Sequence, residues 1–140
     1  MFNPSREQVR QFFVDTWGRY RAATPLQALE MVALEVILLH PEYHGLLEAP
    51  ERSVHRDYTP EMGQTNPLLH MSLHLALEEQ LSIDQPAGVR GAFDQMLRKS
   101  ATRHDALHAG LECLGEMLWK SQRDGTPPDA QRYLQCLKRR

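Results

Sequence analysis

The sequence predicts an all-α protein, a compact helical bundle of about five to six helices in a single domain over residues 1–140. Apolar residues recur at intervals of three and four along several segments, as on the buried face of an amphipathic helix. Prolines, glycines and capping residues stand at the ends of these segments, and no segment shows the alternation typical of a strand. The chain is long enough to bury a core without disulfides.

The N-terminal half is expected to hold two long helices and a short one. Ser5 is a good N-cap for a first helix over about residues 5–21. Thr24 is expected to open a second, strongly apolar helix. Pro41 ends or kinks that helix, because its ring clashes with the preceding turn and it has no amide hydrogen, and a short helical turn follows. Residues 49–66 are polar and contain two prolines, which predicts an exposed loop, either a spacer or a lid over a site.

The C-terminal half is expected to hold four more helices, joined by short connections that favour antiparallel packing. Each helix has a capping residue or a proline at its start. The expected spans run from Asn66 to about Ile83, from Pro86 onward, from about Thr102 to Gln122, and over a short segment after Asp129.

Composition and charge exclude several classes of function. The net charge of −2 gives no surface for a polyanion, so nucleic acid is not expected as a partner. The basic residues 138–140 lie at the end of the last helix, where they complement its macrodipole. Arg6, Glu7 and Arg10 occupy the place where a signal peptide needs an apolar core, and no run approaches 18 apolar residues. We therefore expect a cytoplasmic protein without a membrane partner.

The two cysteines, Cys113 and Cys136, are 23 residues apart and form no CxxC motif. In a reducing compartment such cysteines are free thiols within helices. Neither has the context of a catalytic nucleophile.

Six of the seven histidines form pairs four residues apart, and a glutamate follows each pair after four more residues. The pairs and their glutamates are His40, His44 and Glu48; His70, His74 and Glu78; and His104, His108 and Glu112. Residues four apart share one face of a helix, so two imidazoles can bind one cation. The glutamate lies about 12 Å from the first histidine but one turn from the second, so it could reach a neighbouring metal. The pattern predicts a divalent transition metal, iron, zinc or manganese, in a mononuclear or dinuclear site.

Helical phase supports this interpretation best for the segment 66–83. There His70, His74 and Glu78 lie opposite the polar arc of the helix and are flanked by apolar side chains, so they should be buried. Buried polar groups need partners, and one metal would serve all three. The alternative is a network of histidines hydrogen-bonded to one another, to glutamates or to backbone, without an ion.

The other pairs have weaker support. His104, His108 and Glu112 border an apolar arc, and Gly115 in the same stripe would let a helix or a ligand approach closely. Pro41 makes a continuous helix through His40 doubtful, although a helix that starts at His40 could still bring His40 and His44 together.

Glu35 is a separate candidate ligand. It interrupts the apolar run VALEVILL, where a carboxylate must be paired, protonated or ligating. A salt bridge to an arginine of a neighbouring helix is the alternative for Glu35 and the preferred interpretation for Glu30.

Several strings in the chain are specific: NPSREQVRQFF, HPEYH, NPLLHMSLH, HDALH, and CLGEMLWKSQRDGTPPD followed by YL. In these the chain resembles a small family of uncharacterised bacterial proteins, catalogued only as a domain of unknown function. Relatives usually carry an acidic residue just before the second histidine of HDALH, where this chain has Leu107, which argues against a ligand role for that position here. The resemblance implies one intact domain and attaches no activity to it. Hemerythrin-like bundles offer an analogy of ligand style only.

Two functions follow from these observations. The first is a metal-binding helical protein with a buried His/Glu site: redox-active iron or manganese would imply a non-heme metal oxidoreductase, and zinc with an open position a hydrolase. The second is a non-enzymatic adaptor or regulator with a structural zinc site or a metal-free buried histidine network that responds to pH. The sequence leaves open the small-molecule substrate or protein partner and the oligomeric state.

Overall fold

The structure is a computed structural model that describes residues 6–48 and 67–140. These residues hold seven α-helices, one 3₁₀ turn and no strand, so the all-α prediction is confirmed, with one or two helices more than expected. The chain divides into two compact units, Met1–Leu75 and Ala76–Arg140, and each is described by itself. The predicted loop over 49–66 lies outside the described residues, and the single-domain organisation stays a prediction.

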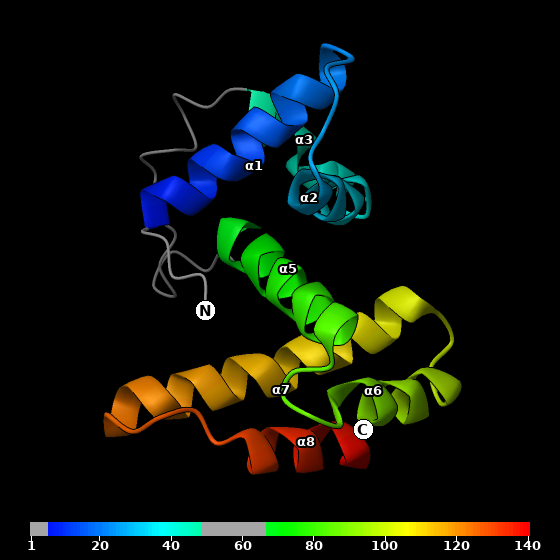
Figure 1. The fold of residues 1–140 in the computed structure, drawn as a ribbon, viewed down its shortest axis with the longest axis vertical. Coiled ribbons are helices and arrows are strands. Elements are labelled where there is room, and N and C mark those ends of the chain that lie inside the picture. The colour runs from blue at the N-terminus through cyan, green and yellow to red at the C-terminus, as the bar shows by residue number, and fades with distance from the viewer. Residues whose placement is uncertain (1–5, 49–66) are drawn as a thin grey trace. The chain divides into compact units, whose positions relative to one another are not determined.

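The first unit is built on three helices, a 3₁₀ turn and the start of a fourth helix. These are α1 (Arg6–Arg21), α2 (Ala28–Leu38), η1 (Pro41–Tyr43), α3 (His44–Glu48) and the first part of α5 (Pro67–Ile83). Helix α1 packs against both α2 and α3 (Figure 1). The core of this unit is apolar and includes Phe13, Val36, Ile37, Leu47 and Met71, each at most 2% exposed.

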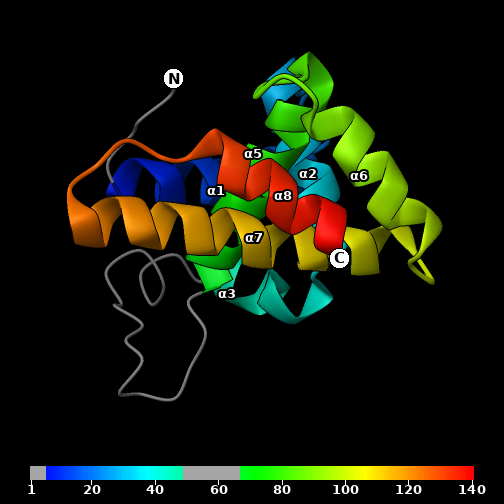
Figure 2. The same cartoon turned by 90° about the horizontal axis from the view of Figure 1, so that it is seen from below.

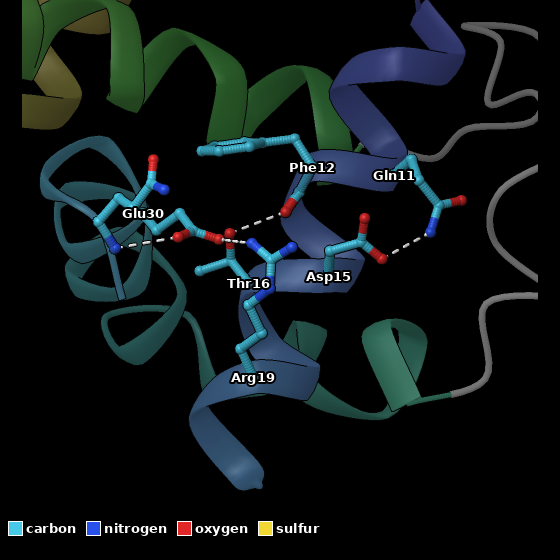
Figure 3. A network of polar contacts seen from close by, with 7 residues as sticks. Gln11, Phe12, Asp15, Thr16, Arg19 and Glu30 are labelled. Carbon is cyan, nitrogen blue, oxygen red and sulfur yellow. Dashed lines mark hydrogen bonds and ion pairs between the residues drawn. The ribbon is translucent and has the colours of Figure 1, made fainter. Parts of the chain in front are cut away.

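The start of α2 is held by an ion pair between buried Glu30 and exposed Arg19 of α1 (Figure 3). Glu30 is buried, accepts a hydrogen bond from the backbone N–H of Gln27 at 3.0 Å and pairs with Arg19, as its sequence context predicts. The hydrogen bond from Gln27, followed by Arg19, lowers the pKa of Glu30. The prediction that Thr24 opens this helix is therefore wrong. The N-cap is Gln27, three residues after Thr24, because Gln27 and Glu30 supply the capping contact.

The second unit contains the last part of α5 with α6 (Val89–Arg98), α7 (Arg103–Asp124) and α8 (Ala130–Arg139). Two of its helix starts are capped as predicted. The Thr102 hydroxyl accepts the N–H of Asp105 at 3.0 Å, and the Asp129 carboxylate accepts the N–H of Arg132 at 3.1 Å. Helix α8 lies along α7 in both views (Figures 1 and 2).

Hydrogen bonds of Asp84 and Arg90 stabilise the connection between α5 and α6. Asp84 accepts the backbone N–H of Arg90 at 3.0 Å, and this hydrogen bond lowers the pKa of Asp84. The Arg90 guanidinium donates to the carbonyls of Leu81 and Ser82, both at 3.0 Å, at the end of α5. Helix α6 consequently begins at Val89 rather than at Pro86.

The prediction of two free thiols is wrong for this structure. Cys113 on α7 and Cys136 on α8 form a disulfide, with their Cα atoms 5.8 Å apart. The two cysteines lie far apart in sequence, and the packing of α8 along α7 brings them within bonding range. Spacing alone could not show this, because it depends on which faces of the two helices meet.

The close approach expected at Gly115 occurs instead at Gly110. A methyl group placed at Gly110 would meet Leu77 Cδ2 at 3.0 Å and Met96 Cε at 3.6 Å. At Gly115 no described atom outside the local helix lies within 4 Å of that position. Gly110 therefore lets α5 and α6 pack closely on α7, one turn and a half before the predicted position.

Among the residues that the structure describes, no helix has both the length and the hydrophobicity that a bilayer span requires. The compartment stays a prediction.

Candidate metal centre

His40 stands at the break that Pro41 makes in the chain. Helix α2 ends at Leu38, and His40 precedes the 3₁₀ turn Pro41–Tyr43, as the proline predicted. The side chain is 2% exposed, and its Nδ1 lies 2.8 Å from the carbonyl oxygen of Val36. A carbonyl oxygen only accepts, so Nδ1 carries the hydrogen and the Nε2 of the neutral ring presents a lone pair.

His70 and His74 form the predicted pair on one face of α5. Their Nε2 atoms are 3.2 Å apart, and His74 is completely buried while His70 is half-buried. The helix places the two imidazoles one above the other, because residues four apart are separated by one turn.

His40 meets this pair from the segment between α2 and the 3₁₀ turn. Its Nε2 lies 3.2 Å from Nε2 of His70, and a ring nitrogen of His40 lies within 4.8 Å of one of His74. His40, His70 and His74 are called the histidine triad below. The triad therefore joins the chain break at Pro41 to the first turns of α5.

Two of the three nitrogen separations in the triad fit ligands of one metal ion. Two nitrogens each about 2.0–2.1 Å from a zinc ion, at a tetrahedral angle, are about 3.4 Å apart. The two Nε2–Nε2 separations of 3.2 Å are close to this value. Both separations share the Nε2 of His70, and a ring nitrogen of His40 lies within 4.8 Å of one of His74.

Hydrogen bonding between the rings accounts for these contacts less well. With a lone pair on His40 Nε2, His70 Nε2 must carry a hydrogen to donate to it. That one hydrogen would then also face His74 Nε2 at the same 3.2 Å. A cation in place of the hydrogen would accept a lone pair from all three nitrogens.

His44 lies outside the triad, although the sequence pairs it with His40. Its Nε2 donates to the carbonyl of Ile37 at 2.9 Å, and its ring packs on Trp17 with a centroid distance of 4.3 Å. The 3₁₀ turn at Pro41 separates the two histidines, so they share no helical face. His44 stabilises the carboxyl end of α2.

His104 and His108 form the predicted pair on the first turns of α7, in the second unit. Both are half-buried, their ring centroids are 4.2 Å apart, and a nitrogen of one ring lies within 4.8 Å of a nitrogen of the other. The pair can present two imidazole donors. That these donors belong to one centre with His70 and His74 stays a prediction.

A family model described as a domain of unknown function (DUF1841) matches residues 5–139. The chain belongs to the DUF1841 family. The resemblance in the HPEYH, NPLLHMSLH and WKSQRDGTPPD strings is thereby confirmed over nearly the whole chain. Comparisons with curated proteins and with solved structures gave no match.

The carboxylates predicted as ligands of the DUF1841 protein take other positions. Glu35 is exposed, because it lies about 200° around α2 from the buried Ala33. Glu78 pairs with Arg103 at 2.6 Å, and Glu112 is exposed and pairs with Arg140 at 2.9 Å. Among the described residues of the first unit, the triad is thus a set of imidazoles alone.

Tyr43 is a neighbour of the histidine triad, and the sequence analysis did not predict its place there. Its ring stacks on His40 with a centroid distance of 5.4 Å and an interplanar angle of 8°, and it meets His70 edge-on at 6.3 Å. Burial raises the pKa of the Tyr43 hydroxyl. Its place inside HPEYH, two residues after Pro41, was the available signal.

Proposed function

We propose that this DUF1841 protein is a metal-binding protein in which His40, His70 and His74 hold one zinc ion. The observation that carries the proposal is the pair of 3.2 Å separations that bring three Nε2 atoms together. Buried polar groups need partners, and one ion could serve all three imidazoles at once.

The donor set favours zinc among the three metals considered from the sequence. Imidazole nitrogen suits zinc, copper, iron and nickel, whereas manganese prefers carboxylate, carbonyl and water ligands. The predicted carboxylates Glu35, Glu78 and Glu112 are exposed or engaged with arginines. The 3.2 Å separations correspond to a nitrogen–metal–nitrogen angle of about 100° for zinc–nitrogen bonds of about 2.0–2.1 Å, which a zinc site can accommodate.

The surroundings of His40 resemble those of a metal ligand. A ligating histidine almost always donates its second ring N–H to a carboxylate, a backbone carbonyl or water, which fixes the tautomer and the ring orientation. His40 does this through Nδ1 to the carbonyl of Val36. The Tyr43 ring stacks on the same imidazole and limits its rotation. His40 is therefore preorganised with Nε2 towards His70.

Three histidines are the protein ligands of zinc sites that keep a fourth position for water, and metal-bound water is a nucleophile near neutral pH. A hydrolase is the reaction class that this donor set supports best. A zinc ion whose fourth coordination position is filled by a protein group would support the adaptor or regulator instead.

Cobalt substitution tests the site and its fourth position together. Untagged protein is stripped with a chelator and titrated with Co²⁺, and the visible absorption is recorded before and after azide is added. We expect a tetrahedral spectrum that saturates at one equivalent and shifts with azide. A saturating spectrum that azide leaves unchanged would favour the adaptor, and the absence of a tetrahedral spectrum would contradict the triad as a zinc site.

In this titration His70→Ala is the test variant and His44→Ala is its matched control. Both variants remove one imidazole from the same unit, but the ring nitrogen of His44 is engaged with Ile37. We expect the spectrum to persist in His44→Ala and to disappear in His70→Ala.

A further inference from the structure

The second unit contains a cavity of about 580 Å³ between α7, the turn after it, and α8, with the disulfide in its wall. This volume lies in the range of pockets that bind small molecules. Both Cys113 and Cys136 line it, so the cavity gives access to a bond that is otherwise part of the helix packing. The cavity lies within the second unit and is independent of the histidine triad.

The two sulfur-bearing residues differ in exposure. Cys113 is 1% exposed, whereas Cys136 is half-buried. Thiol–disulfide exchange needs a thiolate to reach one sulfur along the S–S axis, so access decides which sulfur is attacked. Cys136 is the more accessible residue of the two, so we expect attack at its sulfur with Cys113 as the leaving group.

The cavity wall carries both charges, with a small positive excess. Four basic residues and three acidic residues line it: Lys120, Arg132, Arg139 and Arg140 against Glu116, Asp124 and Asp129. Lys120 pairs with Glu116 at 3.1 Å, Arg132 with Asp129 at 3.6 Å, and Arg140 with Glu112 outside the wall at 2.9 Å. A wall with charges of both signs complements a small molecule that has both an ammonium and carboxylates.

We propose that the Cys113–Cys136 disulfide is a reversible thiol-exchange site for a low-molecular-weight peptide thiol bound in this cavity. The thiolate of the small molecule attacks Sγ of Cys136, the Cys113–Cys136 bond breaks, and Cys113 leaves as a thiolate that takes up the proton lost by the attacking thiol. The product is a mixed disulfide on Cys136 and a free thiol at Cys113. A second molecule of the same thiol releases the first as its oxidised dimer and leaves Cys136 as a thiol.

Glutathione serves as the probe, because it is a small peptide thiol with the required charges. The native wild-type protein is incubated with reduced glutathione, quenched with acid, alkylated and mapped by peptide mass spectrometry. We expect glutathione on Cys136 and the alkylating reagent on Cys113. An adduct on Cys113, or an adduct that forms only after the protein is unfolded, would overturn the proposal.

Charge variants separate binding in the cavity from simple accessibility of the bond. Lys120→Gln with Arg139→Gln should slow the reaction with glutathione on the order of threefold or more, because the wall then loses its positive excess. The reaction with neutral β-mercaptoethanol should change less than twofold. Arg98→Gln with Lys99→Gln removes the same charge from exposed residues outside the wall and should leave both rates unchanged. Equal slowing by the two pairs of substitutions, or none by either, would contradict a bound peptide thiol.

Discussion

The Nε2 atoms of His40 and His70 lie 3.2 Å apart, although 30 residues separate them in the chain. One imidazole is held beside a proline break by the carbonyl of Val36, and the other projects from the second turn of α5. This contact is the basis for proposing His40, His70 and His74 as three ligands of one metal ion. The predictions below test that set and the structure around it.

Zinc should stabilise the native protein, because a ligand that binds only the folded state adds to its stability. At a free zinc concentration of 1,000 times the dissociation constant the gain is about 4 kcal/mol. We expect this zinc-dependent increment in wild type and in His44→Ala, and its loss in His70→Ala. Urea unfolding with and without buffered zinc measures it, and an equal increment in all three proteins would argue against the triad.

The ion pair between Glu30 and Arg19 should make stability depend on acid pH. The pKa of Glu30 is lowered in the folded protein from its ordinary value of 4.5, so its contribution is complete above that value and is lost as the pH falls through the folded pKa. We expect Glu30→Gln to be less stable than wild type at pH 7 and the difference to shrink below pH 4.5. Unfolding curves across this range test the direction, and a difference that grows towards acid pH would contradict it.

The disulfide should contribute to the stability of the second unit. Closing a loop of 23 residues restricts the unfolded chain and stabilises the folded one by about 3 kcal/mol. The double variant Cys113→Ser, Cys136→Ser should therefore lose about that amount in chemical unfolding, without loss of helix content in the folded state. Unchanged stability, with both cysteines titrating as thiols in the native wild type, would show that the cross-link is not formed in solution.

Two glycines on α7 should respond in opposite ways to a larger side chain. Gly110→Val would place carbon atoms against Leu77 and Met96 and should destabilise the protein by about 1–3 kcal/mol. Gly115→Ala meets no described neighbour within 4 Å and should stabilise it by up to about 1 kcal/mol through helix propensity. Thermal unfolding of both variants and of wild type measures these changes in stability. The same change in stability for both variants would contradict the described packing on α7.

The helices could be predicted from the sequence because their signals are local. Pro67, Thr102 and Asp129 mark helix starts within one residue of those observed, and Pro41 ends the helical path of α2 as expected. The local signal misled at two helix starts: α6 begins at Val89 rather than at Pro86, and α2 begins three residues after the predicted position. At α2 the Gln27–Glu30 contact wins over Thr24.

The candidate site could be predicted only in part. Helical phase indicates which side chains are buried, but it does not show which residues of other elements pack against them. Phase identified His70 and His74 on α5, and the HPEYH string drew attention to His40. Which of His40 and His44 joins them depends on the turn at Pro41, and the disulfide depends on the faces where α7 and α8 meet. Such features arise from tertiary packing, which a period along one helix does not describe.

Elemental analysis of untagged protein tests the central claim most directly. The account predicts about one equivalent of zinc per chain for wild type after purification without chelator. It predicts retention of that zinc in His44→Ala and its loss in His70→Ala, with all three proteins folded by circular dichroism. Wild-type protein without stoichiometric metal, whose stability is the same before and after chelator treatment, would contradict the account.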